Sequence, residues 1–170
     1  MRKKIINTIA IILLCLTSEA QEVLCDNVYQ IEIPNDMWLM DQHPDATFEI
    51  ANYENEHYLM VIHESKSDFK QLLTSKKNNI LEEYTTLLAD GLSEAFGNAE
   101  AVVSNIKFKN YKAKRIKVAG SSEGVRISWH TITVETELYL YQICYWTLIN
   151  NNENKSMSKL FNVAKTFEEL

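Results

Sequence analysis

Residues 67–97 read SDFKQLLTSKKNNILEEYTTLLADGLSEAFG, and this stretch decides how the rest of the chain is interpreted. Its apolar residues recur at spacings of three and four, the period of an α-helix with one buried face. They are Phe69, Leu72, Leu73, Ile80, Tyr84, Leu87, Leu88, Leu92, Ala95 and Phe96. Ser67 or Asp68 can cap the start of this helix, and Gly97 suits the position after its end. The pattern predicts one long amphipathic helix over residues 68–96.

Segments with a period of two lie on both sides of this helix, and that period is typical of β-strands. Strands are expected at residues 28–33, 46–52, 57–64, 101–108, 112–118, 125–134 and 138–149. Helical spacing returns in residues 156–167, which predicts a short C-terminal helix capped by Ser156. Hairpin-connected strands with helices between and after them indicate an α+β domain, in which helices cover an antiparallel sheet.

The composition excludes several classes of protein. The chain has 170 residues, is 46% hydrophobic and contains only four Gly and two Pro, so it is neither disordered nor collagen-like. Its 17 Lys and Arg against 23 Asp and Glu argue against nucleic-acid binding, which requires clustered positive charge. The length suits one compact domain.

The N-terminus has the pattern of a secretory signal peptide. Arg2, Lys3 and Lys4 precede the apolar residues 5–16, and Ser18 and Ala20 put small residues before a cleavage site at Gln21. The apolar run is shorter than the roughly 20 residues of a membrane-spanning helix. A lipoprotein signal is disfavoured because Cys15 follows two leucines. We therefore expect residues 1–20 to be a signal peptide and residues 21–170 to be one exported domain, periplasmic or secreted, with no integral membrane segment.

Removal of this signal makes the chain more acidic. The signal holds three basic residues and one acidic residue, so 14 basic and 22 acidic side chains remain, a formal charge of −8. An acidic surface repels nucleic acid and anionic lipid, and it attracts a basic partner. Simple solubility is the other explanation of the same charge.

The order of elements resembles the PsbP-like family. Ile31-Glu32-Ile33-Pro34 ends the first strand and Trp38 follows closely, as is usual in that family, although Met37 stands where the family has Gly. An aromatic closing strand, with Tyr139, Tyr141, Tyr145 and Trp146, leads to the C-terminal helix. The resemblance implies an α/β/α sandwich around a central antiparallel sheet. It also implies a non-catalytic protein that binds other proteins.

Two cysteines follow the signal peptide, Cys25 and Cys144. In an oxidising compartment they could form a disulfide that closes a long loop. Cys144 lies in an aromatic-rich strand, where a cysteine is often a small buried hydrophobe. Both interpretations remain open from the sequence.

Catalytic and cofactor motifs are absent from the sequence, which has no P-loop, GxGxxG, GxSxG or HExxH. His57 and His63 are six residues apart on one predicted strand, about 20 Å by strand rise, so they cannot share a metal ion. His43 with Asp41 and Asp45 could form a metal site in a loop, but Pro44 favours an exposed turn. Ser128 and His130 lack an identifiable oxyanion element or orienting carboxylate. We therefore expect no enzyme activity, cofactor or metal.

One concentration of basic residues marks the best-located binding site that the sequence offers. It spans eleven residues and comprises Lys107, Lys109, Lys112, Lys114, Arg115 and Lys117. The residues could form a patch for an anionic partner, or a solvated strand edge whose lysines deter strand addition. The aromatic residues of the last two strands could likewise line a ligand groove or pack in the sheet.

Four functions remain open for an exported protein of this kind. The expected one is a non-enzymatic accessory protein that binds a protein partner. The alternatives are a small-molecule binding protein with a pocket between helix and sheet, an enzyme that uses His130 or His63, and an inhibitor or immunity-type protein whose acidic surface covers a cationic enzyme.

Overall fold

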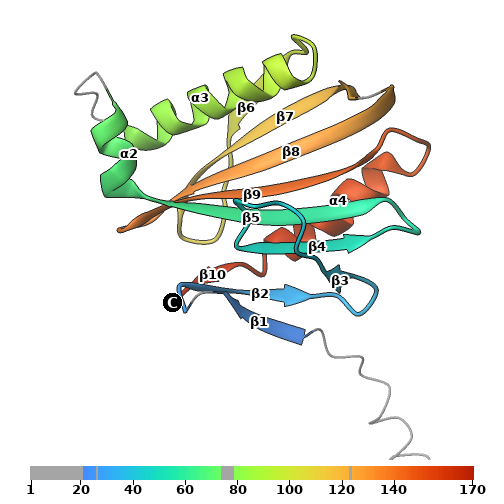
Figure 1. The fold of residues 1–170 in the computed structure, drawn as a ribbon, viewed down its shortest axis with the longest axis horizontal. Coiled ribbons are helices and arrows are strands. Elements are labelled where there is room, and N and C mark those ends of the chain that lie inside the picture. The colour runs from blue at the N-terminus through green and yellow to red at the C-terminus, as the bar shows by residue number, and fades with distance from the viewer. Residues whose placement is uncertain (1–20, 26, 74–78, 123) are drawn as a thin grey trace, which may run out of the picture.

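The computed structural model describes residues 21–25, 27–73, 79–122 and 124–170, and its centre is a seven-stranded antiparallel sheet (Figure 1). The strand order is β3-β4-β5-β9-β8-β7-β6. The strands are β3 (Trp38–Leu39), β4 (Phe48–Asn52), β5 (His57–Ser65), β6 (Ala101–Asn105), β7 (Lys112–Ser122), β8 (Val125–Glu135) and β9 (Tyr139–Leu148). The predicted antiparallel sheet is confirmed.

The predicted first strand lies outside this large sheet. It is β2 (Tyr29–Ile33), which forms a three-stranded sheet with β1 (Gln21–Cys25) and β10 (Glu168–Glu169). The aromatic rings of Tyr29, Tyr141 and Phe167 join the two sheets. The ring centroid of Tyr141 lies 5.7 Å from that of Tyr29 and 4.9 Å from that of Phe167, and all three side chains are fully buried.

The prediction of one helix over residues 68–96 is wrong, because the segment forms two helices. The first is α2 (Lys66–Leu72), whose N-cap is Ser65 rather than Ser67 or Asp68, and it ends where Leu73 becomes extended. The second is α3 (Ile80–Ala95), capped by the Asn79 side chain, which accepts from the Glu82 amide. Residues 74–79 are all polar, so the apolar stripe is interrupted there and a second cap is available.

The C-terminal helix is present, three residues earlier than predicted. It is α4 (Glu153–Ala164), and Ser156 is a buried residue within it rather than its cap. The helices α2 and α3 cover one face of the large sheet, while α4 packs on β9 and β5 at the other face (Figure 1). This is the α/β/α arrangement that the resemblance to the PsbP-like family implies.

The predicted signal peptide, residues 1–20, lies outside the described residues. Within the described ranges, no helix has the length and apolar character needed to cross a membrane.

Candidate binding surfaces and pockets

The basic residues of β7 point to opposite faces of the sheet, because side chains alternate along a strand. Lys112 and Lys114 belong to the α3 face, where Lys114 Nζ lies 2.6 Å from Glu82 Oε2 of α3. Arg115 and Lys117 belong to the α4 face. The predicted binding residues on β7 are therefore divided between two surfaces.

The remaining two predicted binding residues lie in the link between β6 and β7. Lys107 is exposed, and Lys109 adopts a left-handed backbone with φ of 48°. Lys109 Nζ donates to the Thr166 carbonyl at 3.3 Å and lies 3.8 Å from Glu168 Oε2. The six residues thus occupy three places, and a role in binding stays a prediction for each.

Arg115 and Lys117 form a cluster with His130 and Tyr145 on the α4 face. Lys117 is the cross-strand neighbour of His130, which is the neighbour of Tyr145 on β9. His130 Nδ1 lies 3.4 Å from the Tyr145 hydroxyl oxygen. Burial, followed by the positive charges of Lys117 and Arg115, lowers the pKa of His130 to about 4. The imidazole is therefore neutral at pH 7, and the cluster carries two positive charges.

A cavity of about 460 Å³ opens beside this cluster, between the sheet and the first turn of α4. Its polar lining comes from Lys117, Ser128, His130, Glu100, Glu153 and Asn154. Ser128 and His130, considered above as a nucleophile and a base, share this wall. Among the described residues no hydrogen bond joins them, and the charged side chains that shift the pKa of His130 are Lys117 and Arg115 rather than a carboxylate.

A row of buried polar residues crosses the sheet beneath the start of α4. Asn52 pairs with His57 and Ser128 pairs with Thr147. Tyr58 of β5 pairs with Trp146 of β9. The adjacent residues of these two antiparallel strands, His57 and Thr147, are therefore also neighbours. His57 Nδ1 and Thr147 Oγ1 are buried and have no hydrogen-bond partner among the described residues. The sequence analysis missed this row because cross-strand neighbours depend on register.

A second cavity, of about 400 Å³, adjoins this polar row. It is lined in part by Asp36, His57, Lys155 and Lys159. Lys159 forms an ion pair with Asp36, and their hydrogen bond lowers the pKa of that carboxyl group. Desolvation lowers the pKa of His57, so this imidazole is also neutral at pH 7.

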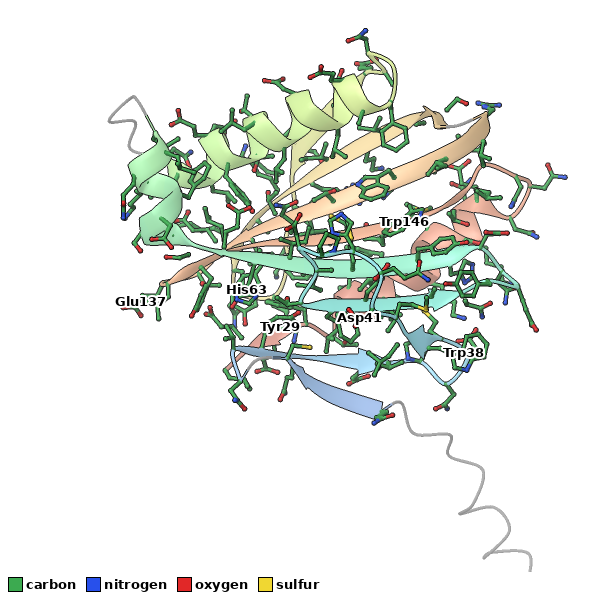
Figure 2. The ribbon with its side chains drawn as sticks, in the orientation of Figure 1. Tyr29, Trp38, Asp41, His63, Glu137 and Trp146 are labelled. Carbon is green, nitrogen blue, oxygen red and sulfur yellow. The ribbon has the colours of Figure 1, made fainter. Side chains whose placement is uncertain are left out.

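Aromatic rings form a continuous row on the α3 face of the sheet, where strands β5, β9 and β8 lie side by side. Trp146 stacks on Trp129 at 4.4 Å between centroids and on Tyr58 at 5.2 Å. Phe96 extends the row at one end, and Tyr53 extends it at the other. Figure 2 shows Trp146 on the sheet and Trp38 at its β3 edge. Packing accounts for most of this row, since its three central rings lie against one another.

The β3 edge of the sheet exposes large apolar side chains. Trp38 is 54% exposed, Leu39 is 57% exposed, and Tyr53 in the β4–β5 turn is 52% exposed. Trp38 and Tyr53 lie on the α3 side of this edge and Leu39 on the opposite side, since side chains alternate along a strand. We call these three residues at the edge the β3 surface. Residues 21–65, which build β1 to β5, contain ten Asp or Glu and no Lys or Arg. The β3 surface therefore belongs to a segment in which every Asp, Glu, Lys or Arg residue is acidic.

Cys144 is a buried free thiol in the structure, and its Sγ lies 3.4 Å from Thr131 Oγ1 on the α3 face. Cys25 packs in the core between the small sheet and the other face of the large sheet. The sheet thus separates the two residues, and no disulfide joins them. Among the described residues, no group of three His, Cys, Asp or Glu side chains could hold a metal ion.

Comparison with known proteins gives likenesses of structure only. No family model matches the chain, and no curated sequence matches it. Cyanobacterial PsbP (CyanoP) of Synechocystis sp. PCC 6803 is similar with a TM-score of 0.60 and 14% identity, over 91% of this chain and 96% of that one.

Two further solved structures are similar over most of their length. LpqN, described as involved in cell envelope biogenesis of Mycobacterium tuberculosis, gives a TM-score of 0.59 at 13% identity, covering 91% of this chain and 87% of its own. The Ran-binding protein Mog1p of Saccharomyces cerevisiae gives 0.58 at 10% identity, covering 88% and 95%. These likenesses confirm the expected PsbP-like resemblance at the level of fold. The chain has the fold shared by PsbP and Mog1.

Proposed function

We propose that this chain is a non-catalytic, exported accessory protein that binds a cationic protein partner through the β3 surface. The observation that carries the proposal is the exposure of Trp38, Leu39 and Tyr53 within a segment that has no basic residue. Trp and Tyr are enriched among residues that dominate binding energy at protein interfaces. The ten acidic residues of this segment favour a partner that carries Lys and Arg beside an apolar patch.

Three further observations support this proposal. One of the proteins with this fold is described as Ran-binding, which is a precedent for protein recognition by the architecture. In the described part of the chain, the hydrogen bonds and ion pairs give no nucleophile–base–carboxylate series of the kind that hydrolases use. Export is supported by the pattern of residues 1–20.

The test compares capture of partners from an envelope extract of the source organism by immobilised residues 21–170 and by single variants. Trp38→Ala is expected to weaken capture of a specific partner by about 30-fold, the effect of losing an interface residue worth about 2 kcal/mol. Leu138→Ala is the matched control, because Leu138 is 65% exposed but lies in the β8–β9 turn. Capture should also fall steeply with salt.

Equal capture by wild type and Trp38→Ala, or capture that is insensitive to salt, would refute the β3 surface as the binding site. The half-exposed position of Trp38 makes it a suitable probe, since its replacement should leave the fold intact. Circular dichroism of each variant checks that condition.

A further inference from the structure

The cavity between β7, β8 and the start of α4 is lined by both positively and negatively charged side chains. Lys117 of β7 supplies a positive charge to its lining, while Glu100, just before β6, and Glu153, on α4, supply two negative charges. Arg115 lies two residues before Lys117 on the same face of β7, outside the lining. Among the ion pairs of the described residues, none includes Arg115 or Lys117. Neither of these two positive side chains is therefore paired with a carboxylate.

The cationic side also has unused hydrogen-bonding capacity. Beside the cavity lining, Arg115 has a buried Nε without a hydrogen-bond partner among the described residues, although its side chain hydrogen-bonds the Tyr145 hydroxyl group. A buried donor without a partner carries a free-energy penalty, which a bound acceptor would remove. His130 and the Tyr145 hydroxyl group lie beside it on the same face, and both are uncharged polar groups at pH 7. This arrangement suits a carboxylate, which accepts several hydrogen bonds at once.

The acidic side of the cavity restricts the ligand further. A ligand that is only an anion would be repelled by Glu100 and Glu153, whereas an ammonium group would be attracted to them. The cavity volume of about 460 Å³ is within the range of small-molecule sites, which is about 300–1,000 Å³.

We propose that this cavity binds a small zwitterion, a free α-amino acid or a short peptide. The carboxylate of the ligand lies toward Lys117 and His130, and its ammonium group lies toward Glu100 and Glu153. The site is distinct from the β3 surface, because four strands separate β3 from β7 in the large sheet. The proposal therefore stands or falls separately from the proposed function.

The experiment is a titration of isotopically labelled residues 21–170 with glycine, L-alanine, L-leucine and L-alanyl-L-alanine at millimolar concentrations. The readout is the NMR signal of the His130 imidazole, assigned by its loss in His130→Gln. Saturable movement of this signal with at least one of these ligands is expected. Acetate, which has only the carboxylate, and ethylamine, which has only the ammonium group, should bind more weakly.

The matched variants are Lys117→Gln and Lys112→Gln, which remove the same charge from opposite faces of one strand. Lys117→Gln is expected to weaken binding about tenfold or more, through loss of a charge-assisted contact. Lys112→Gln should leave binding unchanged. A bound carboxylate should also raise the pKa of His130 above the value of about 4 in the ligand-free protein. The negative charge of the ligand offsets the positive charges of Lys117 and Arg115, which lower that pKa.

Three results would overturn the proposal. The first is no saturable shift with any of the four ligands. The second is equal binding by Lys117→Gln and Lys112→Gln, which would place the ligand elsewhere. The third is acetate binding as tightly as glycine, which would show an anion site with no role for Glu100 and Glu153.

Discussion

Replacement of Gly120 by alanine tests how the end of α3 is held on the sheet. A Cβ atom at residue 120 would lie 2.9 Å from Phe96 Cβ, 3.1 Å from Phe96 Cδ1 and 3.3 Å from the Phe96 carbonyl oxygen. Two of these atoms belong to or adjoin the backbone, so a side-chain rotation cannot relieve the contact. Phe96 must move away, and its contact with Trp129 at the end of the aromatic row moves with it.

The expected cost of Gly120→Ala is about 1–3 kcal/mol, as for other overpacked sites. For a domain of this size that corresponds to a fall of about 2–12 °C in Tm. Gly91→Ala is the matched control, since a Cβ there meets nothing within 4 Å and the residue lies inside α3. This control should stabilise the fold by about 0.5–1 kcal/mol.

Thermal unfolding of residues 21–170, followed by circular dichroism, measures both changes. The two variants add the same methyl group and are expected to shift the Tm in opposite directions. A Tm of Gly120→Ala at or above that of wild type would refute the close packing of Phe96 against β7.

Three other changes test separate parts of the structure. Phe167→Ala should destabilise the fold by about 3–5 kcal/mol in urea unfolding, because Phe167 is fully buried between the two sheets, whereas Leu170→Ala at an exposed site should change stability by less than about 0.5 kcal/mol. His130 has a folded pKa of about 4 and an ordinary value of 6.5, so the unfolded chain binds more protons between these values and stability should fall as pH decreases from 6.5 to 4. His130→Gln should reduce that pH dependence, and an unchanged slope would contradict the assignment. Burial raises the pKa of Cys144 to about 12, so in a Cys25→Ala variant of residues 21–170 the thiol should react with a thiol reagent only as fast as the chain unfolds.

The sequence predicted the positions of helices and strands better than it predicted which of them lie side by side. The α+β class, the hairpins and the C-terminal helix follow from local period, which a single segment carries. The break between α2 and α3 was missed because apolar spacing on both sides of residues 74–79 fits one helix. The second sheet could not be predicted, since its strand β10 consists of only two residues, Glu168 and Glu169, which are too few to show an alternating pattern.

The candidate sites were also difficult to predict, because the sequence does not show which residues lie side by side. Arg115 and Lys117 were selected for their charge, but only the register shows that His130 and Tyr145 lie beside them and that Lys112 and Lys114 do not. The β3 surface has a signal in the sequence, since residues 21–65 contain ten Asp or Glu and no Lys or Arg. That signal appears when charge is counted by segment, whereas the total for the chain conceals it. The exposure of Trp38 and Leu39 depends on β3 being a sheet edge, which is a property of the whole topology.

Photo-crosslinking from one defined position tests the central claim most directly. A photoreactive phenylalanine derivative replaces Trp38 in one sample and Leu138 in another, and each protein is irradiated in the envelope extract of the source organism. The account predicts one dominant adduct from position 38, with a basic protein, that disappears at high salt, and no such adduct from position 138. The same adducts from both positions, or none from position 38, would contradict binding through the β3 surface.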